Sequence, residues 1–226
     1  MHDIPAGLMR VRERIAAAAE RTGRRLDDVL LIAVSKTVEV ERIREAIAAG
    51  ASALGENRVQ EAKAKVEALG RPVPWHLIGH LQTNKVKDAL ACFDVIHSVD
   101  RLDVAREIDR RATRPIDVLL EVNVAEEPQK SGFAPDAVAA ALDVIAGMVH
   151  LKVRGLMAIP PVVERAEDSR PAFRTLRALA KRHALGELSM GMSSDFEVAV
   201  EEGATMVRVG TAIFGPRASK PPLVTP

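Results

Sequence analysis

The sequence contains no tyrosine and only one cysteine, Cys92, among its 226 residues. The missing tyrosine excludes any mechanism that uses a phenol as its base. A single cysteine excludes an intrachain disulfide, a CxxC redox pair and a zinc site built from cysteines, and it fits a reducing compartment. Cys92 itself is expected to be a small, buried hydrophobic residue.

The sequence also lacks a strong net charge and a long apolar segment near its start. Its 32 lysines and arginines oppose 31 aspartates and glutamates, which leaves a formal charge of +1. No overall field therefore favours nucleic acid or an anionic membrane. Arginine and glutamate recur through residues 1–25, so we expect neither a signal peptide nor a membrane span there. We expect a cytoplasmic protein whose partner is a small molecule.

The length of the chain and its 47% hydrophobic content allow one domain with a sizeable core. Apolar runs rich in β-formers alternate with stretches of helical periodicity, without a break in composition that would mark a linker. Eight strands are predicted, at residues 29–35, 52–54, 75–79, 95–98, 117–124, 152–158, 188–192 and 206–209. The predicted helices cover residues 6–22, 39–49, 59–69, 84–91, 102–111, 135–148, 168–183 and 195–202.

This alternation predicts an α/β fold, a single TIM (β/α)8 barrel over residues 1–226 with an extra N-terminal helix. Strands such as VLLIAV and DVLLEVNV are continuous hydrophobic runs, which is typical of parallel strands buried on both faces. An open doubly wound sheet would carry a glycine-rich segment after its first strand, and AVSKT contains no glycine. The proline-rich end, at about residues 216–226, is expected to be loosely ordered.

Lys36 follows the first predicted strand, at the end of the barrel where ligands bind. Lysine forms Schiff bases with carbonyl groups, and a partly buried position favours the neutral amine that attacks the carbonyl carbon. The position alone leaves a solvated lysine as the alternative. Further evidence must come from the residues that would face Lys36 across the barrel.

The loops after the last two predicted strands contain groups suited to a phosphate. Ser193 and Ser194 precede a predicted helix, and Gly210 and Thr211 follow the last strand. A capping box between Ser194 and Glu197 is the alternative, which would leave Ser193 for a ligand. A lysine that faces a phosphate seat is the arrangement that pyridoxal 5′-phosphate (PLP) requires, because this cofactor carries one aldehyde and one phosphate.

Arg208 lies two residues before Gly210 and is predicted to reach the cofactor ring, with a surface arginine as the alternative. An arginine at the pyridine nitrogen would keep that nitrogen unprotonated and weaken the ring as an electron sink. Asn57 and Met157 lie near other strand ends and complete the predicted cofactor-binding residues, as supporting neighbours. No catalytic residue is predicted.

Three other patterns are weaker. The segment GMSSD begins like the nucleophile elbow of hydrolases, but Asp195 stands where the second glycine would be. His76 and His80 fall on one predicted strand, where their spacing separates them by about 13 Å, so no metal site is predicted. His97 could line the barrel mouth, although a hydrogen-bonded structural histidine is more common.

With these residues in view, the chain resembles the pyridoxal phosphate homeostasis protein family over nearly its whole length. The resemblance rests on eight segments in the same order: AVSKT, GENRVQEAKAK, WHLIGHLQTNK, HSVD, KSGF, RGLMAIPP, LSMGMSSD and MVRVGTAIFG. It implies a barrel of the alanine racemase N-terminal type in which Lys36 holds PLP as a Schiff base. It further implies that Arg208 faces the pyridine nitrogen, and that the phosphate is held by Ser193, Gly210 and Thr211. Some relatives carry other residues at Arg58 and His80, which leaves this set intact.

The resemblance implies a role in intracellular PLP homeostasis without conventional catalytic turnover, so we expect a monomeric binding protein rather than an enzyme. Transient contact with PLP-dependent apoenzymes is expected, and binding of nucleic acid or membranes is not. A racemase-like amino-acid enzyme with weak activity remains an alternative. A racemase that pairs lysine with tyrosine is excluded by the missing tyrosine, and we expect no further β-domain after the eighth strand. A Schiff-base aldolase acting on a phosphorylated sugar is a third alternative, although such enzymes more often carry their lysine on a later strand.

Overall fold

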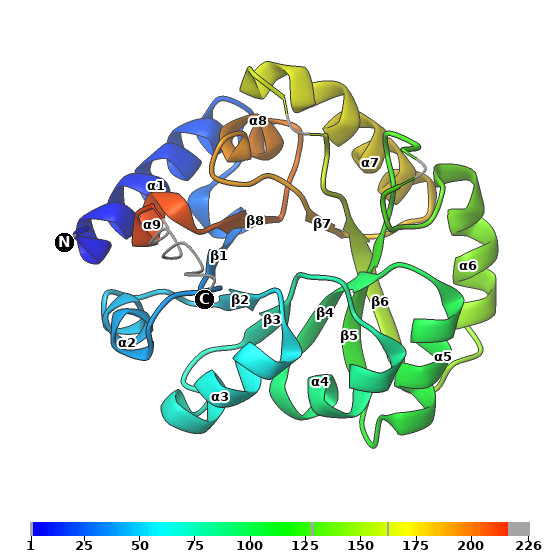
Figure 1. The fold of residues 1–226 in the computed structure, drawn as a ribbon. Helices are drawn as coiled ribbons and strands as arrows, with labels where there is room; N and C mark the ends of the chain where they lie inside the picture. The colour runs from blue at the N-terminus through cyan, green and yellow to red at the C-terminus, as the bar shows by residue number, and fades with distance from the viewer. Residues whose placement is uncertain (1, 128, 162, 217–226) are drawn as a thin grey trace, which may run out of the picture.

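The computed structural model describes residues 2–127, 129–161 and 163–216 and shows a closed barrel of parallel strands (Figure 1). The strands follow one another around the barrel in sequence order, and the first pairs with the last to close it. They are β1 (Leu30–Val34), β2 (Leu54–Glu56), β3 (Trp75–Leu77), β4 (Val95–Val99), β5 (Ile116–Glu121), β6 (Leu151–Met157), β7 (Glu187–Ser189) and β8 (Met206–Val209). The predicted TIM-barrel fold is confirmed.

Helices surround the barrel, and an extra helix precedes the first strand, as predicted (Figure 1). The α-helices are α1 (Ile4–Glu20), α2 (Val40–Ala48), α3 (Val59–Leu69), α4 (Val86–Cys92), α5 (Leu102–Arg111), α6 (Val138–Ile145), α7 (Arg170–Arg182), α8 (Phe196–Glu201) and α9 (Thr211–Phe214). Short 3-10 helices are η1 (Leu26–Asp28), η2 (Thr83–Lys85), η3 (Pro135–Ala137) and η4 (Ala166–Ser169). α9 was not predicted because a single helical turn leaves no periodic pattern.

Several predicted boundaries were wrong. β2 spans Leu54–Glu56 rather than 52–54, because Leu54 and the glycine after it pair with β1 and the glutamate is fully buried. A buried glutamate is unusual, so a sequence pattern ends the strand before it. β3 and β7 also end two and three residues earlier than predicted. The predicted tail lies, apart from Pro216, outside the described residues.

α1 packs between the outer helices α2 and α8 through an apolar face. The side chains of Ile4, Leu8, Val11 and Ile15 are at most 1% exposed. The helix begins at Asp3, whose Oδ1 accepts a hydrogen bond of 2.9 Å from the Ala6 amide. Within the described residues, no helix combines the length and apolar character needed to cross a membrane.

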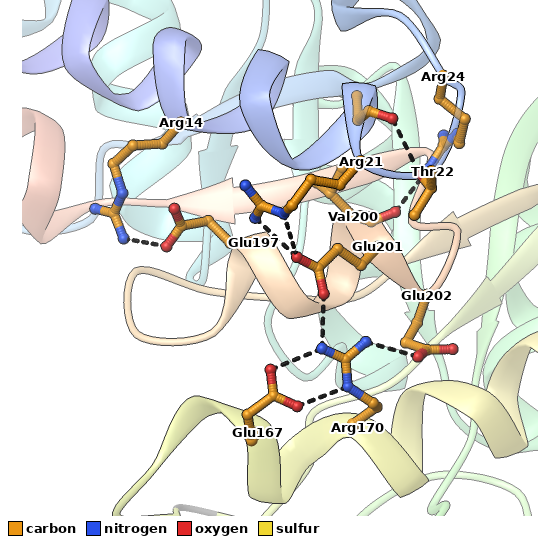
Figure 2. A network of polar contacts seen from close by, with 11 residues as sticks. Arg14, Arg21, Thr22, Arg24, Glu167, Arg170, Glu197, Val200, Glu201 and Glu202 are labelled. Carbon is orange, nitrogen blue, oxygen red and sulfur yellow. Dashed lines mark hydrogen bonds and ion pairs between the residues drawn. The ribbon is translucent and has the colours of Figure 1, made fainter.

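Ion pairs join the outer helices α1, α7 and α8 (Figure 2). Arg21, directly after α1, lies 2.7 Å from a Glu201 oxygen on α8, and Arg170 of α7 lies 2.6 Å from the other oxygen. The Arg170 guanidinium also contacts Glu202 and Glu167. This network fixes the helix that follows one of the loops predicted to hold the phosphate.

Candidate functional site

One cavity at the C-terminal end of the strands brings together seven of the eight predicted cofactor-binding residues. Its volume of about 620 Å³ lies in the range typical of small-molecule sites. The predicted residues that line it are Lys36, Asn57, Ser193, Ser194, Arg208, Gly210 and Thr211, and its apolar walls are Val34, Ile78, Ile159 and Met192. Met157 is the exception, since it is fully buried at the end of β6 and does not line this cavity.

The residues on either side of Lys36 are held by side chains from α3. Lys65 Nζ donates a hydrogen bond of 2.7 Å to the Ser35 carbonyl oxygen. The Thr37 amide donates a hydrogen bond of 2.5 Å to Glu61 Oε1. Thr37 has a φ of 62°, a left-handed conformation that is strained for a β-branched residue. These hydrogen bonds hold the backbone on both sides of Lys36, including the strained residue Thr37.

Lys65, which holds the Ser35 carbonyl, is itself buried between two carboxylates. Its Nζ lies 2.8 Å from Glu56 Oε1 and 2.6 Å from Glu61 Oε1, and the Ser35 hydroxyl donates to Glu56 Oε1 at 2.6 Å. Burial raises the pKa of Glu56, although Lys65 and Ser35 act to lower it. Burial also acts on Glu61, but hydrogen bonds from Lys65 and the Thr37 amide lower its pKa. We call Ser35, Glu56, Glu61 and Lys65 the Lys65 cluster.

Arg208 lies inside the barrel on β8, where only 3% of it is exposed, so the alternative of a surface arginine is wrong. One guanidinium nitrogen donates a hydrogen bond of 2.6 Å to Ser189 Oγ, and another donates one of 2.9 Å to the Ala158 carbonyl oxygen. Burial lowers the pKa of Arg208 to about 10, while Glu121 and Asp195 act to raise it. The guanidinium therefore stays charged at neutral pH with its orientation fixed.

Two neutral histidines continue the hydrogen bonds from Ser189 into the barrel. His97 Nδ1 lies 2.9 Å from Ser189 Oγ, and His97 Nε2 lies 2.8 Å from His76 Nδ1. Burial lowers the pKa of His76 to about 4 and that of His97 well below its usual value. Each neutral ring offers one donor and one acceptor, which allows every link of the chain to be satisfied. We call Arg208, Ser189, His97 and His76 the Arg208 relay.

The two loops predicted to hold a phosphate meet at the cavity. The Gly210 amide after β8 donates a hydrogen bond of 3.4 Å to Ser193 Oγ after β7. Gly191 begins the β7 loop with a φ of 91°, and a Cβ there would lie 2.5 Å from the Ala199 side chain. Only glycine fits this turn, because the conformation and the space both exclude a side chain.

The predicted alternative of a Ser194–Glu197 capping box is wrong. The residue before α8 is Asp195, and its Oδ1 accepts a hydrogen bond of 2.7 Å from the Met192 amide. The Glu197 carboxylate instead pairs with Arg14 of α1 at 2.6 Å (Figure 2). The exposed Ser194 side chain is left on the cavity lining.

The remaining histidine and cysteine predictions have clear outcomes. His80 lies outside β3, against the prediction, because the strand ends at Leu77, and its Nδ1 is 2.9 Å from Asp100 Oδ2. His97 is the hydrogen-bonded structural histidine rather than part of the cavity wall. Cys92 is 3% exposed, as predicted. Within the described residues, no group of three or more acidic, histidine or cysteine side chains is arranged to hold a metal ion.

Known proteins resemble this chain in sequence and in fold. The family model for the alanine racemase N-terminal domain matches residues 8–218. A protein of Aquifex aeolicus named pyridoxal phosphate homeostasis protein is 49% identical over 220 residues, which cover 93% of this chain and 96% of the relative.

Two solved structures extend the comparison. PipY of Synechococcus elongatus, solved with PLP bound, is 40% identical with a TM-score of 0.78, and the match covers 91% of this chain and all of PipY. An alanine racemase of Clostridium difficile is 13% identical with a TM-score of 0.70, and the match covers 93% of this chain and 57% of the racemase. The racemase therefore shares the barrel fold alone with this chain, whereas PipY shares both sequence and fold.

Proposed function

This chain belongs to the alanine racemase N-terminal domain family, and from that membership we propose that it binds PLP on Lys36 and serves in PLP homeostasis. The relative from Aquifex aeolicus carries that function in its name, and PipY was solved with PLP bound. The proposal assigns to the chain a binding role without conventional turnover.

The convergence of three kinds of groups on one cavity carries the proposal. PLP has an aldehyde, a phosphate and a pyridine nitrogen, and the cavity offers a suitable partner for each. Lys36 would form the covalent link to the aldehyde carbon. The loops that meet at Ser193 and Gly210 would hold the phosphate, together with Thr211. Arg208 would donate a hydrogen bond to the pyridine nitrogen.

The residues around the cavity favour binding over catalysis. When bound, PLP supplies an electrophilic carbon and a ring that withdraws electrons most strongly with its nitrogen protonated. Arg208 stays charged and is fixed by Ser189 and Ala158, so it would offer that nitrogen only a donor. The sequence has no tyrosine that could serve as the second base opposite Lys36.

Location, oligomeric state and partner proteins follow from the same proposed role. We expect the protein to act in the cytoplasm as a monomer and to make transient contact with PLP-dependent apoenzymes that receive the cofactor. A lone, buried cysteine is compatible with a reducing compartment. Size-exclusion chromatography coupled to light scattering measures the oligomeric state, and a mass near twice 24.4 kDa would contradict the monomer.

The test is the visible absorption of the purified protein after PLP is added and the excess is removed. We expect an absorption band of protein-bound PLP in the wild type, its loss in Lys36→Ala, and its retention in the control Lys152→Ala, which changes an exposed lysine of β6. A racemase assay with L-alanine on the loaded protein is expected to show no turnover. A colourless wild type would contradict PLP binding, and turnover that depends on Lys36 would favour the racemase-like alternative.

A further inference from the structure

A second cavity, of about 390 Å³, lies beside the first at the same end of the barrel. It is formed by the loops after β2 and β3 and shares Asn57 with the first cavity. Its polar lining is Asn57, Arg58, Gln60, His80, Gln82 and Lys85. These side chains come from GENRVQEAKAK and WHLIGHLQTNK, segments from which the cavity that we assign to PLP takes Asn57 and Ile78 alone.

The lining carries two cations and no carboxylate. The side chains of Arg58 and Lys85 form no hydrogen bond or ion pair with any residue that the structure describes. The charge of Arg58 helps to lower the pKa of Glu61, but that carboxylate is already bonded to Lys65 and the Thr37 amide. The nearby Asp100 carboxylate is already shared between His80 at 2.9 Å and Arg101 at 2.8 Å. Two cations facing one cavity repel each other, so an anion between them is electrostatically favoured.

Asn57 adds a hydrogen-bond acceptor that lacks a donor. Its Oδ1 is buried and has no hydrogen-bond donor among the described residues. A buried acceptor without a donor is destabilising, so a ligand N–H group that reaches it would be bound favourably. The loop that carries Asn57 packs closely against the neighbouring loop, because a Cβ on Gly79 would lie 2.4 Å from the Asn57 carbonyl oxygen.

We propose that this second cavity binds a free α-amino acid. The carboxylate lies between Arg58 and Lys85, and the ammonium group donates a hydrogen bond to Asn57 Oδ1. A simple carboxylate would satisfy only the cations, and a simple amine would satisfy only the amide oxygen. The α-amino acid zwitterion presents both groups on one α-carbon, and the volume of the cavity leaves room for a side chain.

Asn57 connects the amino-acid site to the cavity that we assign to PLP. Because Asn57 lines both cavities, an amino group bound there lies at the wall of the cavity that we assign to PLP. The occupancy of the second cavity would then make a PLP-binding protein responsive to the supply of amino acids. The binding itself needs no cofactor, so it can be tested independently of the proposed function.

The experiment is a calorimetric titration of the full-length protein, prepared without cofactor, with glycine and L-alanine at pH 7. Acetate, methylamine and inorganic phosphate are titrated in parallel. We expect both amino acids to bind at least tenfold more tightly than each of the three other probes. Equal binding of acetate or phosphate would overturn the proposal in favour of an unspecific anion site, and absence of binding would overturn it outright.

Matched variants locate the site. Arg58→Gln and Lys85→Gln are each expected to weaken amino-acid binding at least fivefold, whereas Lys87→Gln, a control on the exposed face of α4, leaves the dissociation constant unchanged. Unchanged binding in Arg58→Gln and Lys85→Gln would contradict the assignment. Lys36→Ala separates the two proposals, because it is expected to abolish covalent PLP binding and to retain amino-acid binding.

Discussion

The two sides of the main cavity hold their functional cations in opposite ways. On the Lys36 side, the Lys65 cluster places one buried lysine between two carboxylates and fixes the backbone on both sides of Lys36. On β8, the strand that pairs with β1, the Arg208 relay holds a buried guanidinium through a hydroxyl group and two neutral imidazoles. One side is held by paired charges and the other by neutral hydrogen bonds.

The difference follows from the two side chains. A lysine amine sits on a flexible four-carbon chain, so its position is best restricted by fixing the backbone that carries it. A guanidinium is planar and has five N–H donors, so its orientation can be fixed by engaging some donors and leaving others for a ligand. Substitutions in the Lys65 cluster and in the Arg208 relay should therefore differ in how much stability they remove and in how that loss depends on pH.

The largest effect is expected for Lys65→Met, which leaves the Glu56 and Glu61 carboxylates facing each other without their cation. Removing one partner of a buried ion pair costs about 3–5 kcal/mol in the free energy of unfolding. Urea denaturation measures this loss, and PLP attachment should weaken because the backbone at Lys36 is released. The control Lys63→Met, on the same helix with its side chain 56% exposed, should lose about 0.5 kcal/mol or less. Equal losses in the two variants would show that the cluster does not hold the Lys36 backbone.

The next largest effect is a change of the free energy of unfolding with pH, and it arises from Glu121, which is close enough to Arg208 for their charges to interact. Burial and the charge of Asp100 raise the pKa of Glu121 to about 7, while Arg208 acts to lower it. Between the unperturbed pKa of 4.5 and about 7, the folded protein retains a proton that the unfolded chain has lost. The contribution of Glu121 to stability therefore falls as the pH rises through this window, by up to about 3 kcal/mol, and is constant above it.

Glu121→Gln isolates this contribution. The difference in the free energy of unfolding between wild type and variant should decline from pH 4.5 to 7 and then stay level, as measured by urea denaturation at each pH. Using the difference removes the opposite contribution of His76, whose lowered pKa makes the protein more stable as the pH rises from about 4 to 6.5. A difference that does not vary with pH would place Glu121 in a solvated environment.

A smaller loss in the free energy of unfolding, together with weaker PLP binding, is expected for Ser189→Ala, which interrupts the Arg208 relay without removing a charge. The guanidinium and His97 each lose one buried partner, at a cost of about 1–3 kcal/mol. Ser189→Thr retains the hydroxyl group and should restore most of the PLP affinity, which is measured by equilibrium dialysis. If Ser189→Ala binds PLP as tightly as wild type, the relay does not position Arg208.

The smallest loss of stability is expected for the surface ion pair of Arg14 with Glu197, which belongs to neither the Lys65 cluster nor the Arg208 relay. The two side chains are 46% and 36% exposed, so Arg14→Ala should lose about 1 kcal/mol or less, with part of that from the contact of Arg14 with the Phe196 ring. Thermal denaturation measures the change, and PLP affinity should be unaltered. A change in PLP affinity would show that this pair positions the loop that precedes α8.

The fold could be predicted from the sequence because barrel strands are apolar on both faces and helices repeat every 3.6 residues. Boundaries failed where tertiary contacts override such patterns. Glu56 pairs with β3 at the end of β2, and its buried carboxylate is compensated by Lys65 of α3, nine residues later. No pattern within the strand itself carries that information.

The site could be predicted in outline, because strand ends of a barrel converge and Lys36, Arg208 and the loop after β7 all lie there. The supporting residues could not. His97 meets Ser189 across 92 positions of the sequence, and their contact exists only once the barrel closes. Met157 also lies at a strand end, but it is fully buried and does not line the cavity, which its position in the sequence does not reveal.

Borohydride reduction of the PLP-treated protein, followed by peptide mass mapping, tests the central claim most directly, because reduction makes a Schiff base permanent on the lysine that formed it. We predict the added mass on the peptide that contains Lys36, together with loss of specific labelling in Lys36→Ala. A wild-type protein whose label lies on other lysines, with the Lys36 peptide unmodified, would contradict the assignment of Lys36 as the residue that holds PLP.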